Sequence, residues 1–235
     1  IIPSLNFPRP AAADTADAQR PAQLRGLSPD QVLVLVDGKR WHPGALLITN
    51  GVLGRGAQAV DLNTIPLAAI DHIEVLRDGA SAQYGSDAIA GVINIILKKG
   101  AKGGSVEATA GQYYAGDGRQ WQGSANFGVP LNGDRGWLRM TVQSGGQNAT
   151  DRSQREQVAP FEDGQRYGDP AAHNQNVFLN SQYDLTPGAQ LYAFGHYSRR
   201  DSTSVAFFRD TTNANAVPSL YPDGYLPLEN AESTD

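Results

Sequence analysis

The chain contains no cysteine, which excludes disulfide bridges, thiolate catalysis and cysteine-ligated metal sites. Charged residues make up only 18% of the sequence, below the roughly 25% that is usual for a soluble domain. The formal net charge is −5 and no basic patch stands out. We therefore expect no nucleic-acid partner.

Long apolar runs are absent as well. No stretch approaches the ~18 apolar residues of a membrane-spanning helix, and no N-terminal signal peptide is visible. What the 235 residues do contain is 26 glycines and 14 prolines, which favour turns, short strands and loops. The chain starts at Ile1 and stops in a polar segment at Asp235, and we interpret both ends as cut points.

Residues 1–100 carry compact apolar runs separated by turn signals. The run Val32 to Val36 predicts a short strand buried on both faces, and Asp37-Gly38 after it is a strong hairpin signal. Four more elements are expected: strands at 73–76 and 92–97, a short helix within 61–70 and a helical turn within 81–89. Together they predict a small α+β domain with a buried sheet.

After Gly103 the pattern changes to alternation of polar and apolar residues. It is clear in 106–110, 120–129, 137–142 and 176–185, with Phe178 as an exception, whereas 191–197 is apolar or aromatic on both faces. Such alternation predicts antiparallel strands with one wet face. The predicted polar row comprises Gln122, Ser124, Asn126, Arg139, Asn180 and Gln182, and Trp121 and Trp137 are candidates for an aromatic girdle.

The connections between these strands alternate in length. Tight turns are expected at 130–134 and 186–188, and long polar loops at about 150–173 and from about 203. Short turns on one side and long loops on the other are typical of outer-membrane barrels. A soluble antiparallel sheet fits the alternation equally well when the alternation is taken alone.

Four ordered motifs carry a family resemblance. The segment 33–40 resembles the strand and turn of the plug domain in TonB-dependent outer-membrane receptors. Segments 60–66, 70–77 and 80–95 follow in the family's order, and Leu24-Arg25-Gly26 precedes them. The resemblance is continuous from about Pro21 to Lys98. It departs from the family at Asp78, where a glycine is common, and it includes no segment like the motif that binds TonB.

This resemblance implies the architecture. We expect an α+β plug domain with a small mixed sheet over residues 1–102, incomplete at its N-terminus. Residues 103–235 would be the N-terminal part of a transmembrane β-barrel, with antiparallel strands. The family barrel has about 22 strands, of which about five would be present.

The resemblance also implies a function, which is TonB-dependent active uptake of a scarce ligand across the outer membrane of a Gram-negative bacterium. A ferric siderophore or similar iron chelate is the favoured ligand. The partners would be TonB with its inner-membrane energising complex, the lipid bilayer and the ligand, with no cofactor, no protein-bound metal and no enzymatic activity. The alternatives are uptake of oligosaccharide or cobalamin, and a secreted soluble β-rich binding module. A hydrolase would need a convergent acid–base pair, which we do not find.

Six residues are candidates for the site. Arg25 and Arg77 match family arginines that pair with acidic residues of the barrel wall, and Glu74 would orient that anchoring network. For each of them an ordinary surface ion pair worth ~0–1 kcal/mol is the alternative. Trp41, His42 and Arg55 are candidate ligand contacts beside a Gly-rich loop at 50–56, and packing of these side chains against the wall is the alternative.

Overall fold

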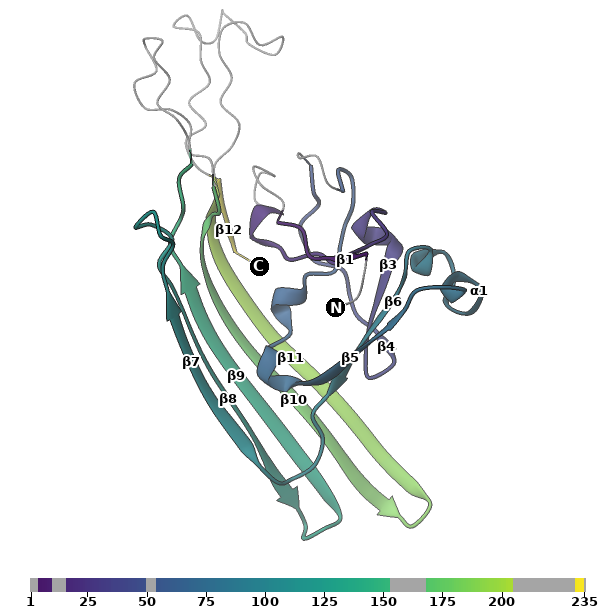
Figure 1. Cartoon of the computed structure of the whole chain (residues 1–235). Coiled ribbons are helices and arrows are strands. Elements are labelled where there is room, and N and C mark those ends of the chain that lie inside the picture. Colours follow the sequence, from purple (N-terminus) through teal and green to yellow (C-terminus); the bar gives the residue numbers. More distant parts are fainter. Residues whose placement is uncertain (1–3, 10–15, 50–53, 153–167, 205–230, 235) are drawn as a thin grey trace, which may run out of the picture.

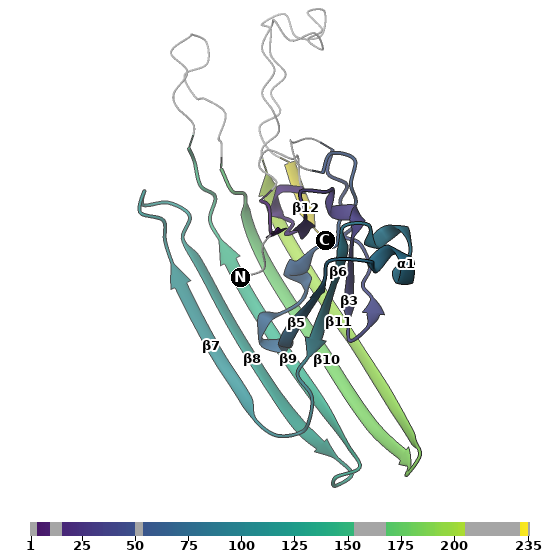
Figure 2. The same cartoon turned by 45° about the vertical axis from the view of Figure 1, so that its right-hand side comes forward.

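The computed structural model describes residues 4–9, 16–49, 54–152, 168–204 and 231–234. It has two parts, shown in Figure 1 and, from another side, in Figure 2. A long curved sheet is formed by the C-terminal half, and we call it the wall. A smaller N-terminal unit lies against the concave face of the wall.

The N-terminal unit is built on a four-stranded mixed sheet in the order β4-β3-β6-β5. Strand β3 (Val32–Val36) pairs in parallel with β6 (Gly91–Leu97) and antiparallel with β4 (Lys39–Arg40). Strand β5 (Ile70–Leu76) lies antiparallel to β6. All five residues of β3 are buried, as the unbroken apolar run predicts, and β5 starts three residues earlier than expected.

Short elements complete this unit. Strands β1 (Leu5–Asn6) and β2 (Gln23–Leu24) pair with each other, and the helical pieces are η1 (Ala16–Ala18), η2 (Pro29–Gln31), η3 (Leu62–Thr64), η4 (Leu67–Ala69), α1 (Ala80–Tyr84) and η5 (Ser86–Ala88). The helix expected within 61–70 is therefore two 3-10 turns. Pro66 stands between them, and a proline has no N–H to continue a helical ladder. No helix in the described ranges is long and apolar enough to cross a membrane.

The core of the unit lies on both faces of β3 and β6. One face buries Leu33, Leu35 and Val92 beneath Ala80 of α1 and Ala88 of η5. The other face belongs to the largest buried cluster, which also takes in Trp41 and, from the wall, Phe178. Full burial of such side chains stabilises the fold by roughly 1.5–3 kcal/mol each. Since Phe178 belongs to this cluster, the wall contributes to the apolar core of the unit.

The wall is a six-stranded antiparallel sheet whose strands follow one another in chain order. Its strands are β7 (Gly104–Gly111), β8 (Gln120–Leu131), β9 (Gly136–Gln147), β10 (Ala171–Thr186), β11 (Ala189–Ser204) and β12 (Ala231–Thr234). The tight turns are found as predicted, at 132–135 and 187–188. The expected long loops fall largely on 153–167 and 205–230, which lie outside the described residues.

The two faces of the wall differ in polarity. The outer row of apolar side chains, among them Trp121, Phe127, Leu179, Leu191 and Tyr197, is exposed. The inner row, including Ser124, Asn126, Arg139, Thr141, Asn176 and Asn180, is buried against the N-terminal unit. The predicted alternation is confirmed, and the outer apolar row meets no second apolar row among the described residues. Phe178 departs from the polar inner row because it packs on the N-terminal unit.

Gly91, the first residue of β6, has no room for a side chain. Its φ is +139°, and a β-carbon there would lie 2.6 Å from the carbonyl oxygen of Leu76. We expect Gly91→Ala to lower the free energy of opening of the β3–β6 pair by about 1–3 kcal/mol, the usual cost of such backbone strain. Hydrogen exchange of the β3 and β6 amides measures this.

Gly79→Ala is the matched control for that substitution. Gly79 also has a positive φ, +68°, but nothing lies within 4 Å of an added β-carbon. It should cost less than Gly91→Ala, because it carries backbone strain without the clash. Equal effects of the two substitutions would contradict the role given to the Leu76 carbonyl.

Candidate functional site

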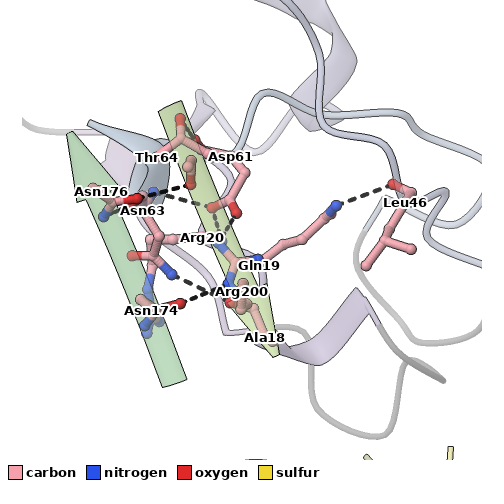
Figure 3. Close-up of polar contacts among 11 residues, drawn as sticks. Ala18, Gln19, Arg20, Leu46, Asp61, Asn63, Thr64, Asn174, Asn176 and Arg200 are labelled. Carbon is pink, nitrogen blue, oxygen red and sulfur yellow. Dashed lines mark hydrogen bonds and ion pairs between the residues drawn. The ribbon is translucent and has the colours of Figure 1, made fainter. Parts of the chain in front are cut away.

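The interface between the N-terminal unit and the wall holds several buried polar contacts. Its best-buried ion pair joins Asp61 of the unit to Arg200 of β11, and each side chain is only 4% exposed. Figure 3 shows the two side chains pointing toward each other. Breaking such a pair by removing one partner costs about 3–5 kcal/mol, because a buried charge is left uncompensated.

Each member of this pair is held in place by further bonds. Asp61 caps η3 by accepting from the backbone N–H of Asn63 at 3.0 Å, and it accepts from the N–H of Arg20 at 2.9 Å. Arg200 also donates from Nε to Asn174 Oδ1 at 2.9 Å. The carboxylate therefore orders the entry of the chain into η3 and binds the wall at the same time.

Further side chains of the wall bond to the unit. Asn176 Nδ2 donates to the carbonyl oxygen of Asn63 at 3.1 Å, and Asn180 Nδ2 donates to that of Lys98 at 3.1 Å. The Tyr192 hydroxyl donates to the carboxylate of Asp37, in the β3–β4 turn. Since buried polar groups are costly when unpaired, these bonds hold the unit in one position on the wall.

Arg139 of β9 holds the segment that joins the unit to the wall. Its guanidinium donates to the carbonyl oxygens of Lys99 (3.2 Å), Gly100 (2.9 Å), Lys102 (3.3 Å) and Gly103 (3.1 Å). Its Nε donates to Asn126 Oδ1 at 2.9 Å. We call residues 99–103 the linker.

An aromatic cluster lies beside these polar contacts. Trp41 is buried, and its ring is stacked 5.8 Å from that of Phe178 and lies 4.5 Å from that of His196. His42 and His196 bring their Nε2 atoms to 3.0 Å. Because His42 Nδ1 lies 2.9 Å from the carbonyl oxygen of Pro43, the hydrogen of His42 is expected on Nδ1, and His196 Nε2–H then donates to His42.

The three predicted anchoring residues lie together at one end of β5, within the N-terminal unit. Arg25 pairs with Asp78, the residue that replaces the common family glycine. Glu74 accepts from Asn94 Nδ2 at 2.8 Å, and Arg77 is exposed. None of the three bonds to a described wall strand, so their anchoring of the barrel stays a prediction. Beside Glu74, a hydrogen bond to Asp71 raises the pKa of His72.

Of the three predicted ligand contacts, Trp41 and His42 lie together in the aromatic cluster. Trp41 and His42 contact the wall, which is the packing role named as their alternative. Arg55 is exposed on the Gly-rich loop, of which residues 50–53 lie outside the described structure. Their contact with a ligand stays a prediction. No group of three or more potential metal-ligating side chains occurs in the part of the chain that is described.

Sequence reasoning missed the Asp61–Arg200 pair. Asp61 lies within the quoted motif at 60–66, and an acidic residue before a short helix signals a cap. Arg200 lies three residues beyond the predicted end of its strand. Its side chain lies on the same face of β11 as those of His196 and Phe194. Because 191–197 is apolar or aromatic on both faces, the sequence does not assign Arg200 to the inner face, and the choice of Asp61 as its partner also needed the fold.

Comparison with known proteins agrees with this arrangement. Residues 2–92 match the family model of the TonB-dependent receptor plug domain. The similarity of this segment is to the TonB-dependent receptors. The N-terminal unit is the plug domain, and the wall resembles the first strands of the receptor barrel.

Two relatives illustrate the range of the family. The chain is 39% identical over 98 residues to a probable TonB-dependent siderophore receptor, PirA, of Acinetobacter baumannii. It is 46% identical over 88 residues to the vitamin B12 transporter BtuB of Vibrio cholerae. These alignments cover 42% and 37% of this chain, and only 13% of each relative.

Solved structures extend the similarity into the wall. The crystal structure of the siderophore receptor PirA from A. baumannii has a TM-score of 0.64 at 26% identity, covering 86% of this chain and 28% of that one. The ferric enterobactin receptor of Pseudomonas aeruginosa, at 23% identity and with a TM-score of 0.64, shows the same fold. The similarity in fold thus includes wall strands that the plug model does not cover.

We expect Asp61→Asn and Arg200→Met each to lower the free energy of plug unfolding by about 3–5 kcal/mol, because each substitution leaves the buried charge of the other residue uncompensated. The double variant should cost less than the sum of the two. Urea unfolding of the full-length receptor, followed by hydrogen exchange of plug amides, completes the double-mutant cycle.

Arg199→Met is the control for the Arg200 substitution. Arg199 is the next residue of β11, but it is exposed and pairs with the exposed Asp201. Surface pairs are worth ~0–1 kcal/mol, so its loss should barely change plug unfolding. An additive cycle between Asp61 and Arg200 would show that the buried pair does not hold the plug.

Proposed function

We propose that this chain is part of an outer-membrane receptor of a Gram-negative bacterium that takes up a scarce ligand with energy delivered through TonB. The supporting observation is the division of polarity across the wall. Apolar side chains cover its outer face, as hydrocarbon requires, while the buried inner row bonds to the plug. A plug held by polar contacts beside one aromatic cluster would close the lumen and stay separable from the wall.

A ferric siderophore or similar iron chelate is the proposed ligand. The relative and the solved neighbour from A. baumannii are named as siderophore receptors, and a further neighbour was crystallised with enterobactin. The named relatives are receptors and transporters, and we propose no enzymatic activity for this chain. Any iron would arrive within the ligand, as cargo.

Cobalamin is the second candidate, and one observation favours it. The B12 transporter of V. cholerae is the more identical of the two relatives, at 46% against 39%. However, a relative named as a siderophore receptor and one named as a vitamin B12 transporter match this chain over similar lengths, 98 and 88 residues. Identity over segments this short does not separate the two ligand classes.

The test is uptake by the full-length receptor in a bacterial strain that lacks its own siderophore and cobalamin receptors. We expect accumulation of radioactive iron from ferric enterobactin, or from another siderophore in a panel, and loss of that accumulation when TonB is deleted. Accumulation of cobalamin instead would select the second candidate. Uptake that survives TonB deletion, or no uptake of any panel member, would overturn the proposal.

A further inference from the structure

The linker differs from the rest of the plug in how it is attached to the wall. Elsewhere, side chains on one part bond to single groups on the other, as Asn176 does to the carbonyl oxygen of Asn63. At the linker, four backbone carbonyl oxygens converge on the one guanidinium of Arg139. A single side chain therefore fixes a whole turn of backbone.

Arg139 is buried, with 7% of its surface exposed, and no described carboxylate pairs with it. Its charge is balanced by carbonyl dipoles and by Asn126 Oδ1. Asn126 is itself fixed, because its Nδ2 donates to Thr141 Oγ1 at 2.5 Å. Lifting the linker from the wall would leave Asn126 Oδ1 as the one acceptor described here for this cation, and a buried charge with too few partners is among the most costly defects in a protein.

Backbone packing adds a second hold on the linker. A β-carbon at Gly128 of β8 would lie 2.5 Å from the carbonyl oxygen of Gly100, so the linker backbone rests directly on this glycine. The N–H of Gly128 also points to the carbonyl oxygen of Gly103, at 3.4 Å. Strand β7 begins at the next residue, Gly104, and pairs with Phe127.

We propose that residues 99–103 stay fixed on the wall while the rest of the plug moves, and that Arg139 is the positioning residue that holds them. The plug then turns or unfolds about this point and remains tethered there, ready to return to the same place. The inference deepens the proposed function, on which it rests for the movement of the plug. Its test uses neither ligand nor TonB. The proposal about the linker and the proposed uptake function can therefore be refuted independently of each other.

The experiment follows two spin-label distances in the full-length receptor in detergent during a urea titration. One pair is Lys102→Cys with Asn132→Cys, which joins the linker to the β8–β9 turn. The other is Gln83→Cys with Asn132→Cys, which joins α1 to the same turn. All three positions are exposed, and the chain has no cysteine of its own.

We expect the Gln83–Asn132 distances to broaden at a urea concentration where the Lys102–Asn132 distances keep their native distribution. With Arg139→Met, the two pairs should broaden together. Arg135→Met is the matched control, because Arg135 also donates to backbone carbonyls, those of Asp184 and Leu185, but only within the wall. It should preserve the wild-type order of the two transitions.

Two results would overturn the proposal. In the wild-type receptor, the linker pair would broaden together with the α1 pair, or Arg139→Met would leave their order unchanged. Should Arg139→Met fail to assemble, Arg139→Lys takes its place. It keeps the charge but loses the planar set of donors, so the two transitions should move closer together, and an unchanged gap would refute the assignment to Arg139.

Discussion

The structure depends on the rule that a polar group removed from water needs a partner. The wall presents polar side chains on its inner face, and several of them bond to groups that the plug supplies. Many of those groups are backbone carbonyls, such as those of Asn63 and Lys98. Backbone carbonyls exist whatever the side chain, so the wall recognises the path of the plug chain as much as its sequence.

The same rule explains why the interface is mixed in character. The stacked rings of Trp41 and Phe178 bury apolar area. This burial stabilises the interface but does not specify the orientation of the plug. The Asp61–Arg200 pair fixes the orientation of the plug on the wall, because its charges tolerate little displacement when buried. An interface of rings alone would let the plug slide, and one of ions alone would gain little stability from burial.

The sequence predicted the elements better than their partners. The unbroken apolar run Val32 to Val36 predicted β3, because a strand buried on both faces is apolar throughout. The alternation in 120–129 predicted β8, because a strand buried on one face alternates. The ends of β9 and β10 were underestimated, since Gly145, Gly146 and His173 carry no alternation. The Asp61–Arg200 contact joins residues 139 positions apart, and it requires the register of every wall strand between them.

In the proposed receptor, the length of the wall strands has a consequence for where ligand would first meet the protein. Strands β10 and β11 each have 16 residues, and at about 3.4 Å per residue and a tilt of about 40° they rise ~40 Å, against an apolar band of about 25 Å. The outward side chains at their loop ends are polar or charged, as at His173 and Arg199. A receptor built this way would carry a collar of protein about 15 Å tall above the hydrocarbon, so capture would begin outside the bilayer.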